Sequence, residues 1–244
     1  MGVGKVRGIV LRQEDTGESG KRIVLFAKGM GKITLSARGA RNAKSKLLAG
    51  TQLFAYGDFM LFEGKGFYSV TQIDLIESFY GIRTDVERLS AGIYLLELTD
   101  QSVLPAMEAD DILEFLLTSL LYLSRSSISP SLICRIYEIK ILQMSGLLSE
   151  ICCGICGKEE EPLYFSRQDG AFYCAAHKPE GAMPLPSGAV RALRFVLEHD
   201  GKEAFGFTLS VEVLTALDTL LEQYGRAHTD IRCKSRNFLS DIST

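Results

Sequence analysis

The chain has 244 residues, of which 46% are hydrophobic and 23% charged, a composition typical of globular proteins and sufficient for one large domain or two to three small ones. No secretory signal is expected, because residues 1–12 contain no continuous apolar stretch, and the most apolar run, residues 112–123, is too short for a membrane span. The net charge of −3 at pH 7 divides unevenly, because residues 1–50 carry eleven Lys and Arg against three acids, a net +8, and the remainder carries −11.

This asymmetry in charge favours an anionic partner for the first part of the chain. The alternative is a basic face that only contacts solvent, and charge alone does not distinguish the two. We expect the protein in the cytoplasm, where a reducing environment disfavours a disulfide framework. The six cysteines therefore indicate a metal site where they cluster.

Short segments rich in β-branched residues dominate the first 80 residues and predict five strands. Glycines separate these segments, as at Gly29 and Gly31, and residues 63–66 have the composition of a hairpin turn. Five strands in about 75 residues suit a small barrel of the OB type, although SH3-like barrels share the pattern. The expected strands cover residues 6–11, 22–27, 32–37, 51–62 and 67–76.

Helical patterns replace the strands after Gly81. Thr84 and Glu87 match a capping box and predict the start of the first helix, with Leu89, Ile93 and Leu96 on its buried face. Ser129 precedes Pro130 and predicts the N-cap of a third helix. The later expected helices cover residues 110–124, 130–144, 187–199 and 210–224, and His228 is expected in a loop without a visible partner.

Two pairs of metal-binding residues lie between the third and fourth expected helices. Cys153 and Cys156 form a C-x2-C pair, and Cys174 and His177 form a C-x2-H pair. Two residues between ligands allow one tight turn to direct both side chains at one ion, and zinc prefers four such ligands in a tetrahedron. The neighbouring Cys152 is an alternative to Cys153, although the spacing favours Cys153.

The residues between the two pairs support a single site. Segments 163–166 and 171–173 are expected to form a hairpin that returns the second pair to the first, as in a zinc ribbon. Four protein ligands leave no open position for water or substrate. We therefore expect one structural Zn²⁺ and no catalytic metal.

Motifs of common enzyme classes are absent from the sequence. It contains no P-loop, no H-E-x-x-H, no G-x-S-x-G and no zinc deaminase pattern. No set of nucleophile and base is evident either. The sequence therefore predicts a protein that is not an enzyme, and a zinc hydrolase or deaminase is a remote alternative.

The stretch from Ala37 to Lys46 combines small residues with four cations. A flexible loop of this kind can follow a phosphate backbone, and each contact releases counterions. Three further cations on the expected barrel are placed to assist. The seven residues expected to contact DNA are Lys5, Arg7, Lys32, Arg38, Arg41, Lys44 and Lys46.

Taken in order, these features resemble the RecO family of bacterial DNA repair proteins. The resemblance rests on Gly8–Leu11, the basic stretch 37–46, the cysteine pairs around a D-G hairpin, and the closing stretch Lys234–Leu239. Each piece alone is weak, but their order is specific. Many zinc-bearing members have a fourth cysteine where this chain has His177, and zinc accepts either set of ligands.

The resemblance implies both a fold and a function. RecO proteins combine an OB barrel with a helical body and, in many members, a zinc module. They bind single- and double-stranded DNA, anneal complementary strands without ATP, and with RecR help to load RecA onto DNA coated by single-strand-binding protein. RecF and, indirectly, RecA are further expected partners, no membrane is involved, and the expected location is the cytoplasm at the nucleoid.

These inferences predict an α+β protein with three parts. An OB-type DNA-binding domain covers residues 1–80, a helical domain covers 81–150 and 187–244, and a zinc-ribbon-like module, residues 151–186, is inserted between the two helical segments. The main alternative is a zinc-ribbon adaptor that binds nucleic acid in transcription or translation. Strand annealing would distinguish a RecO-like chain from such an adaptor.

Overall fold

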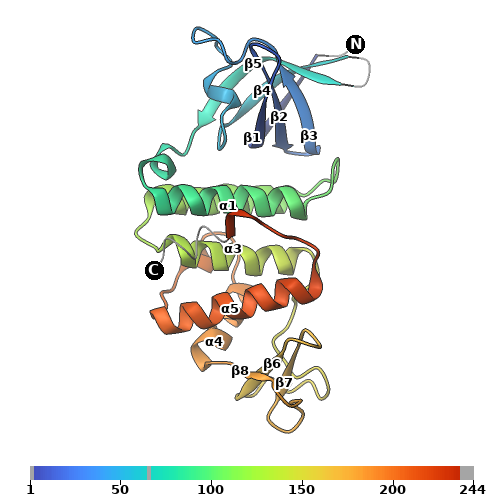
Figure 1. Ribbon diagram of the computed structural model, residues 1–244, viewed down its shortest axis with the longest axis vertical. Helices are drawn as coiled ribbons and strands as arrows, with labels where there is room; N and C mark the ends of the chain where they lie inside the picture. Colours follow the sequence, from blue (N-terminus) through green and yellow to red (C-terminus); the bar gives the residue numbers. More distant parts are fainter. Residues whose placement is uncertain (1–2, 65–66, 237–244) are drawn as a thin grey trace. The chain divides into compact units, whose positions relative to one another are not determined.

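The computed structural model describes residues 3–64 and 67–236 (Figure 1). By its internal contacts the chain divides into two compact units, Met1–Arg125 and Ser126–Thr244. The expected hairpin turn at 63–66 and the closing stretch Lys234–Leu239 lie partly outside the described residues.

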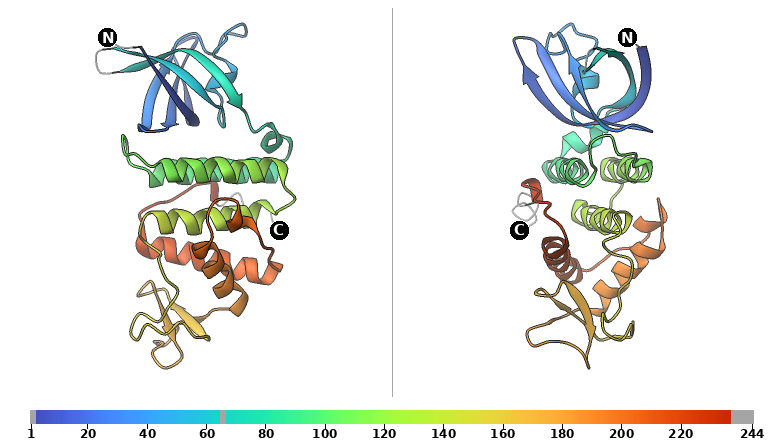
Figure 2. Two further views of the ribbon diagram at one scale, coloured as in Figure 1. Left: turned by 180° about the vertical axis from the view of Figure 1, so that it is seen from behind. Right: turned by 90° about the vertical axis from the view of Figure 1, so that its right-hand side faces the viewer.

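The strands of the first unit close into a barrel, which Figure 2 shows from two further sides. The first strand pairs antiparallel with the second and the fourth, and the third strand pairs parallel with the fifth. This closed order, β1-β2-β3-β5-β4, confirms the expected barrel of the OB type. The strands are β1 (Val3–Thr16), β2 (Gly20–Ala27), β3 (Gly31–Ala37), β4 (Tyr56–Glu63) and β5 (Tyr68–Glu77).

Apolar and polar side chains alternate along the strands, and the apolar ones fill the barrel interior. Ile23 and Leu25 of β2 face Leu35 and Ile33 of β3 across the ladder, and all four are buried. Fully burying an aliphatic side chain of this size contributes about 1.5–3 kcal/mol to folding. Residues 51–55, expected to begin a strand, instead contain the end of a short 3-10 helix (Ala49–Thr51) and a turn before β4 begins at Tyr56.

One irregularity interrupts the pairing of β1 with β2. Val10 lies opposite Leu25, but Arg12 lies opposite Val24, so Leu11 is an extra residue in β1. Such a β-bulge shifts the alternation of the strand by one residue. Arg12 therefore points to the outside of the barrel, where continued alternation would have placed it opposite Ile23 in the core.

Helices α1 (Val86–Ser102) and α2 (Asp110–Arg125) complete the first unit. The expected capping box is wrong, because Asp85, not Thr84, accepts the backbone N–H of Arg88. Thr84 ends a 3-10 turn instead, and its hydroxyl donates to the Gly81 carbonyl.

The buried face of α1 also differs from the expected one. Ile93 is 37% exposed, whereas Tyr94, Leu95 and Leu98 are buried. Of the expected face, Leu96 is buried, as is Val103, a further candidate for it. The neighbouring Gly92 lies on the packed side of α1, since an ideal Cβ there would lie 3.0 Å from the Phe54 ring.

The connection between α1 and α2 lies against β3. The Ala106 N–H donates to the Lys32 carbonyl, and the Gly29 N–H donates to the Asp110 carboxylate. Gly31 has a φ of +67°, and a Cβ there would lie 2.2 Å from the Met107 carbonyl oxygen, so only glycine fits. These contacts join the two helices to the barrel in one unit, so the division by contacts falls after Arg125, whereas the domain boundaries drawn from the sequence stay predictions.

The described residues of the second unit include the helices α3, α4 and α5 and a small sheet. Ser129 accepts the Leu132 N–H and begins the third helix as expected, and Ser210 caps the fifth in the same way. No helix in the described part of the chain has both the length and the apolar composition that a membrane span requires. The elements are α3 (Pro130–Met144), β6 (Leu163–Ser166), β7 (Ala171–Cys174), β8 (Met183–Pro184), α4 (Ser187–Glu198) and α5 (Val211–His228).

The β6–β7 hairpin packs on α5. The rings of Phe165 and Phe172 lie 5.9 and 5.7 Å from that of Tyr224. His228 is the last residue of α5, and its Nε2 lies 2.7 Å from the Gly170 carbonyl oxygen at the hairpin turn. The expectation of a loop at His228 is therefore wrong, because α5 continues through Gly225 for one more turn.

Candidate functional site

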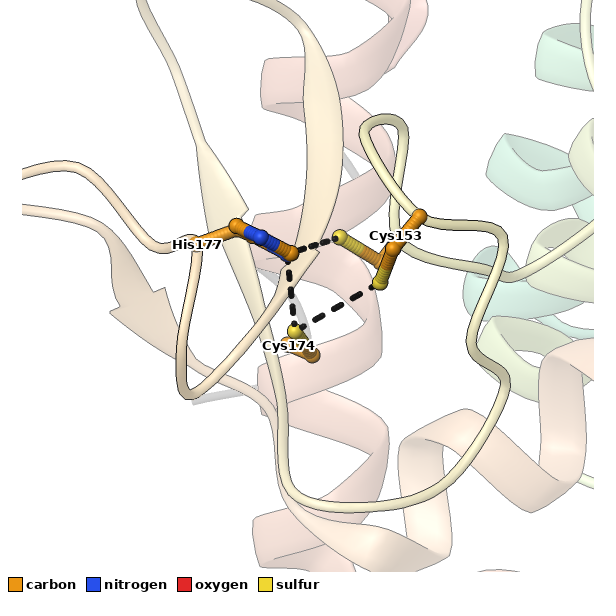
Figure 3. A group of neighbouring side chains, drawn as sticks. Cys153, Cys174 and His177 are labelled. Atoms are coloured by element: carbon orange, nitrogen blue, oxygen red, sulfur yellow. Dashed lines mark hydrogen bonds between the residues drawn. The ribbon is translucent and has the colours of Figure 1, made fainter.

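The four expected metal ligands converge in the second unit. The ligand atoms of Cys153, Cys156, Cys174 and His177 all lie within 4.8 Å of one another. Figure 3 shows the side chains of Cys153, Cys174 and His177 pointing toward a common centre. Cys153 and Cys174 are buried, whereas Cys156 and His177 are exposed, so the cluster lies at the surface of the module.

Local backbone hydrogen bonds position these ligands. The Gly157 N–H donates to the Cys153 carbonyl in a tight turn that ends with a φ of +68° at Gly157. The Gly154 N–H donates to the Phe172 carbonyl and holds this turn beside β7. The second pair begins at Cys174, the last residue of β7, opposite Leu163 in the ladder. The hairpin thus returns the second pair to the first, as the spacing predicts.

The distances between ligand atoms fit one tetrahedral ion. The Cys156 and Cys174 sulfurs are 3.9 Å apart, and His177 Nδ1 lies 3.4 Å from the Cys174 sulfur and 3.6 Å from that of Cys153. A tetrahedral ion with zinc-like bond lengths holds two sulfurs about 3.8 Å apart and a sulfur and a nitrogen about 3.5 Å apart. The chemistry and the spacing of the donors therefore suit a metal ion whose four coordination positions are all filled by protein ligands.

The ionisation of Cys153 also suits a ligand. The backbone N–H of Cys174, with those of Cys156 and Ile155, stabilises the thiolate and lowers the pKa of Cys153 to about 5. Thiolates, not thiols, bind metal ions. Cys152 lies outside the cluster, and burial together with Glu150 raises the pKa of its thiol. The structure thus favours Cys153 over Cys152 as the ligand.

The seven cations expected to contact DNA fall into two groups. The first group has carboxylate partners within the first unit: Lys5 and Arg7 pair with Asp58, Lys32 pairs with Asp100, and Arg41 pairs with Asp15. Lys32 is the most enclosed, because its side chain is 12% exposed and also donates to the Asp100 carbonyl. Part of the +8 charge is therefore balanced inside the fold.

Asp58 is the most strongly paired of these carboxylates. Arg7 donates to both of its oxygens, at 2.7 and 3.0 Å, and the Lys5 ammonium lies 3.0 Å from one of them. The Arg7 hydrogen bonds, with Lys5 beside them, hold the pKa of Asp58 well below its usual range. The negatively charged Asp58 thus forms ion pairs with both cations on the outer face of β1 and β4.

Arg38, Lys44 and Lys46 form the second group. All three are exposed and have no ion pair with any of the residues that the structure describes. Their loop is nevertheless anchored, because Ala40 is fully buried in the barrel core and the Arg41 N–H donates to the Ser19 carbonyl. Contact of these side chains with DNA stays a prediction.

Two further exposed arginines, which are not among the seven expected DNA contacts, lie on the same barrel. Arg12 and Arg22 line a pocket of about 300 Å³ on its outer surface. The alternation within β2 could have identified Arg22 as outward-facing. The position of Arg12 depends on the bulge at Leu11, for which the sequence has no clear signal.

Known protein families match almost the whole chain. The family model described as Recombination protein O N terminal matches residues 1–79, and that described as Recombination protein O C terminal matches residues 83–237. The DNA repair protein RecO of Acetivibrio thermocellus is 34% identical over 242 residues, covering 98% of this chain and 96% of the relative. That of Halalkalibacterium halodurans is 31% identical, with 98% and 95% covered.

Proposed function

The chain belongs to the RecO family of DNA repair proteins, and from this premise we propose that it binds single- and double-stranded DNA and anneals complementary strands without ATP. The observation that carries the proposal is the second group of cations. Arg38, Lys44 and Lys46 are exposed on an anchored loop, and no described carboxylate neutralises them. They are therefore available for phosphate.

Annealing of this kind requires no covalent chemistry, and we propose that the protein is not an enzyme. Two complementary strands repel each other through their phosphates, and cations that replace condensed counterions reduce this repulsion. A loop that contacts only phosphates leaves the base edges free to pair. The protein then lowers the barrier to the meeting of two strands while the bases determine which strands pair.

For the metal cluster we propose Zn²⁺, because three thiolates and one imidazole in a tetrahedron are a typical structural zinc site. Bound there, the ion would supply a cross-link between the two turns that carry the ligands and no reaction chemistry. We further propose that RecR, single-strand-binding protein, RecF and, indirectly, RecA are the protein partners. The proposed location is the cytoplasm, at the nucleoid.

Strand annealing by the purified protein tests the proposal. Two complementary oligonucleotides with a fluorophore and a quencher should pair faster with the protein than without it, in the absence of any nucleotide. The same assay on strands coated with single-strand-binding protein, with and without RecR, tests the mediator function. Normal binding to single strands with no acceleration of pairing would contradict the proposal and favour a nucleic-acid adaptor.

Asp58→Asn is expected to strengthen binding to single-stranded DNA. The substitution removes the charge that occupies Lys5 and Arg7, so both cations become available for phosphate. The affinity should rise about 3-fold at 0.1 M salt, and the slope of log K against log salt should steepen by about 1. Fluorescence anisotropy over a salt series measures both.

The control adds Lys5→Ala and Arg7→Ala to the Asp58→Asn protein. If the gain comes from these cations, the triple variant should lose it. A gain that persists without them would show that Asp58 acts through another route.

A further inference from the structure

The β-bulge in β1 creates a feature that the charge pattern does not reveal. By shifting the register at Leu11, it places Arg12 on the outer face beside Val24. Glu14 then lies opposite Arg22 on the same face, and Val24 lies opposite Thr34 of β3. Arg12, Glu14, Arg22, Val24 and Thr34 together line one pocket of about 300 Å³.

The charges in this pocket are only partly balanced. The Arg12 guanidinium forms long ion pairs with Glu14 at 3.8 Å and Asp100 at 3.5 Å, and its side chain is 57% exposed. Arg22 is exposed and has no ion pair with a described residue. The pocket therefore presents two guanidinium groups, one hydroxyl and one weakly engaged carboxylate above a floor that includes Val24.

This arrangement suits a phosphate attached to an organic group. Guanidinium groups donate paired hydrogen bonds to phosphate oxygens, and the Thr34 hydroxyl can donate a further one. The apolar surface of Val24 suits the sugar or base next to that phosphate. A free inorganic phosphate would use the two arginines but not the apolar floor.

The strand that carries Thr34 also leads directly into the basic loop. Arg22 lies opposite Ser36 in the β2–β3 ladder, and Arg38 follows Ser36 by two residues. A single strand of DNA held at Arg38 would therefore lie only two residues along the chain from Ser36, the partner of Arg22. The paired cations Lys5 and Arg7 lie on β1 where it pairs with β4.

We propose that the pocket between Arg12 and Arg22 binds one phosphodiester group of a DNA strand whose neighbouring phosphates contact the basic loop. This inference rests on the proposed function and extends it to a second surface. Arg22 is the principal contact, Arg12 is the second donor, and Glu14 opposes binding through its negative charge.

Two substitutions of opposite sign test the pocket. Arg22→Ala should weaken binding to single-stranded DNA about 3- to 10-fold and reduce the salt slope by about 0.7, the value for one phosphate of a single strand. Glu14→Gln should strengthen binding, and this gain should disappear in a protein that also carries Arg12→Ala and Arg22→Ala. Both side chains are exposed, so neither change is expected to impair folding, and Arg191→Ala, an exposed arginine of α4, is the matched control.

The occupant is identified by competition. A short oligonucleotide should protect Arg22 from modification by an arginine-selective dicarbonyl reagent at concentrations near its Kd, whereas inorganic phosphate at the same concentration should not. Equal protection by inorganic phosphate would show an anion site without preference for DNA and would overturn the assignment.

The outcomes also separate this inference from the proposed function. If Arg22→Ala and Glu14→Gln leave affinity and salt slope unchanged while neutralising Arg38, Lys44 and Lys46 weakens binding, the pocket is not a DNA site and the proposed function stands. If Arg191→Ala weakens binding as much as Arg22→Ala, the effect is one of overall charge, and the pocket is again excluded. If the unsubstituted protein neither binds single strands nor accelerates their pairing, the proposed function itself fails.

Discussion

Cys174→Ala is expected to abolish stoichiometric metal binding and to unfold the module, residues 151–186. The cluster joins two turns of a module whose strands β6 and β7 have only four residues each. Structural zinc contributes about 10–16 kcal/mol of apparent binding free energy in small zinc domains, more than such a hairpin supplies alone. Metal content per chain and limited proteolysis between Ile151 and Pro186 measure the two effects.

Two control variants make this expectation specific. Cys152→Ala should keep one ion per chain, because Cys152 lies outside the cluster. His177→Cys should also keep the ion, because four thiolates form an equally closed zinc site. The helices of the second unit should keep their far-ultraviolet signal in all three variants. A Cys174→Ala protein with one tightly bound ion and unchanged resistance to protease would contradict the assignment.

Replacing Arg38, Lys44 and Lys46 with alanine together is expected to cause the largest loss of DNA binding. These side chains have no described carboxylate partner, so each phosphate contact they make releases counterions without first breaking an ion pair. The slope of log K against log salt should fall by about 2 for single-stranded DNA, and affinity at low salt should fall about 10- to 100-fold. Anisotropy titrations at four or more salt concentrations measure both values.

The matched control removes three exposed cations of the second unit, with Lys158, Arg167 and Arg191 each replaced by alanine. Its net charge equals that of the loop variant, so a difference between the two reports position and not total charge. A loop variant that binds and anneals like the control would contradict the assignment of the basic loop to DNA.

The parts of this structure that could be predicted from the sequence are those governed by local patterns. Ser129 before Pro130 predicts the start of α3 because both requirements of a helix N-terminus are met within two residues. The metal ligands are predicted for the same reason, because each C-x2 pair occupies a single turn. Only the approach of the second pair to the first depends on residues farther apart in sequence, and the Asp169–Gly170 turn indicates the hairpin that brings them together.

The parts that could not be predicted depend on partners distant in sequence. Arg7 and Asp58 are separated by 51 residues, and only the β1–β4 pairing places them side by side. Charge counting over residues 1–50 therefore overstates the charge available to DNA. The bulge at Leu11 is hidden for a related reason: the register of β1 is set by the whole barrel, and the local sequence is compatible with either alternation.

The anchoring of the basic loop has a consequence for how tightly its cations can hold a strand. Because Ala40 is buried in the core and Arg41 is bonded to the neighbouring hairpin through both its backbone and its side chain, the loop is ordered before DNA arrives. Ordering a free residue costs about 1–2 kcal/mol of conformational entropy. Most of that cost is met during folding. If the loop binds DNA as proposed, we therefore expect its three cations to lose less free energy on binding than the same cations on a disordered tail.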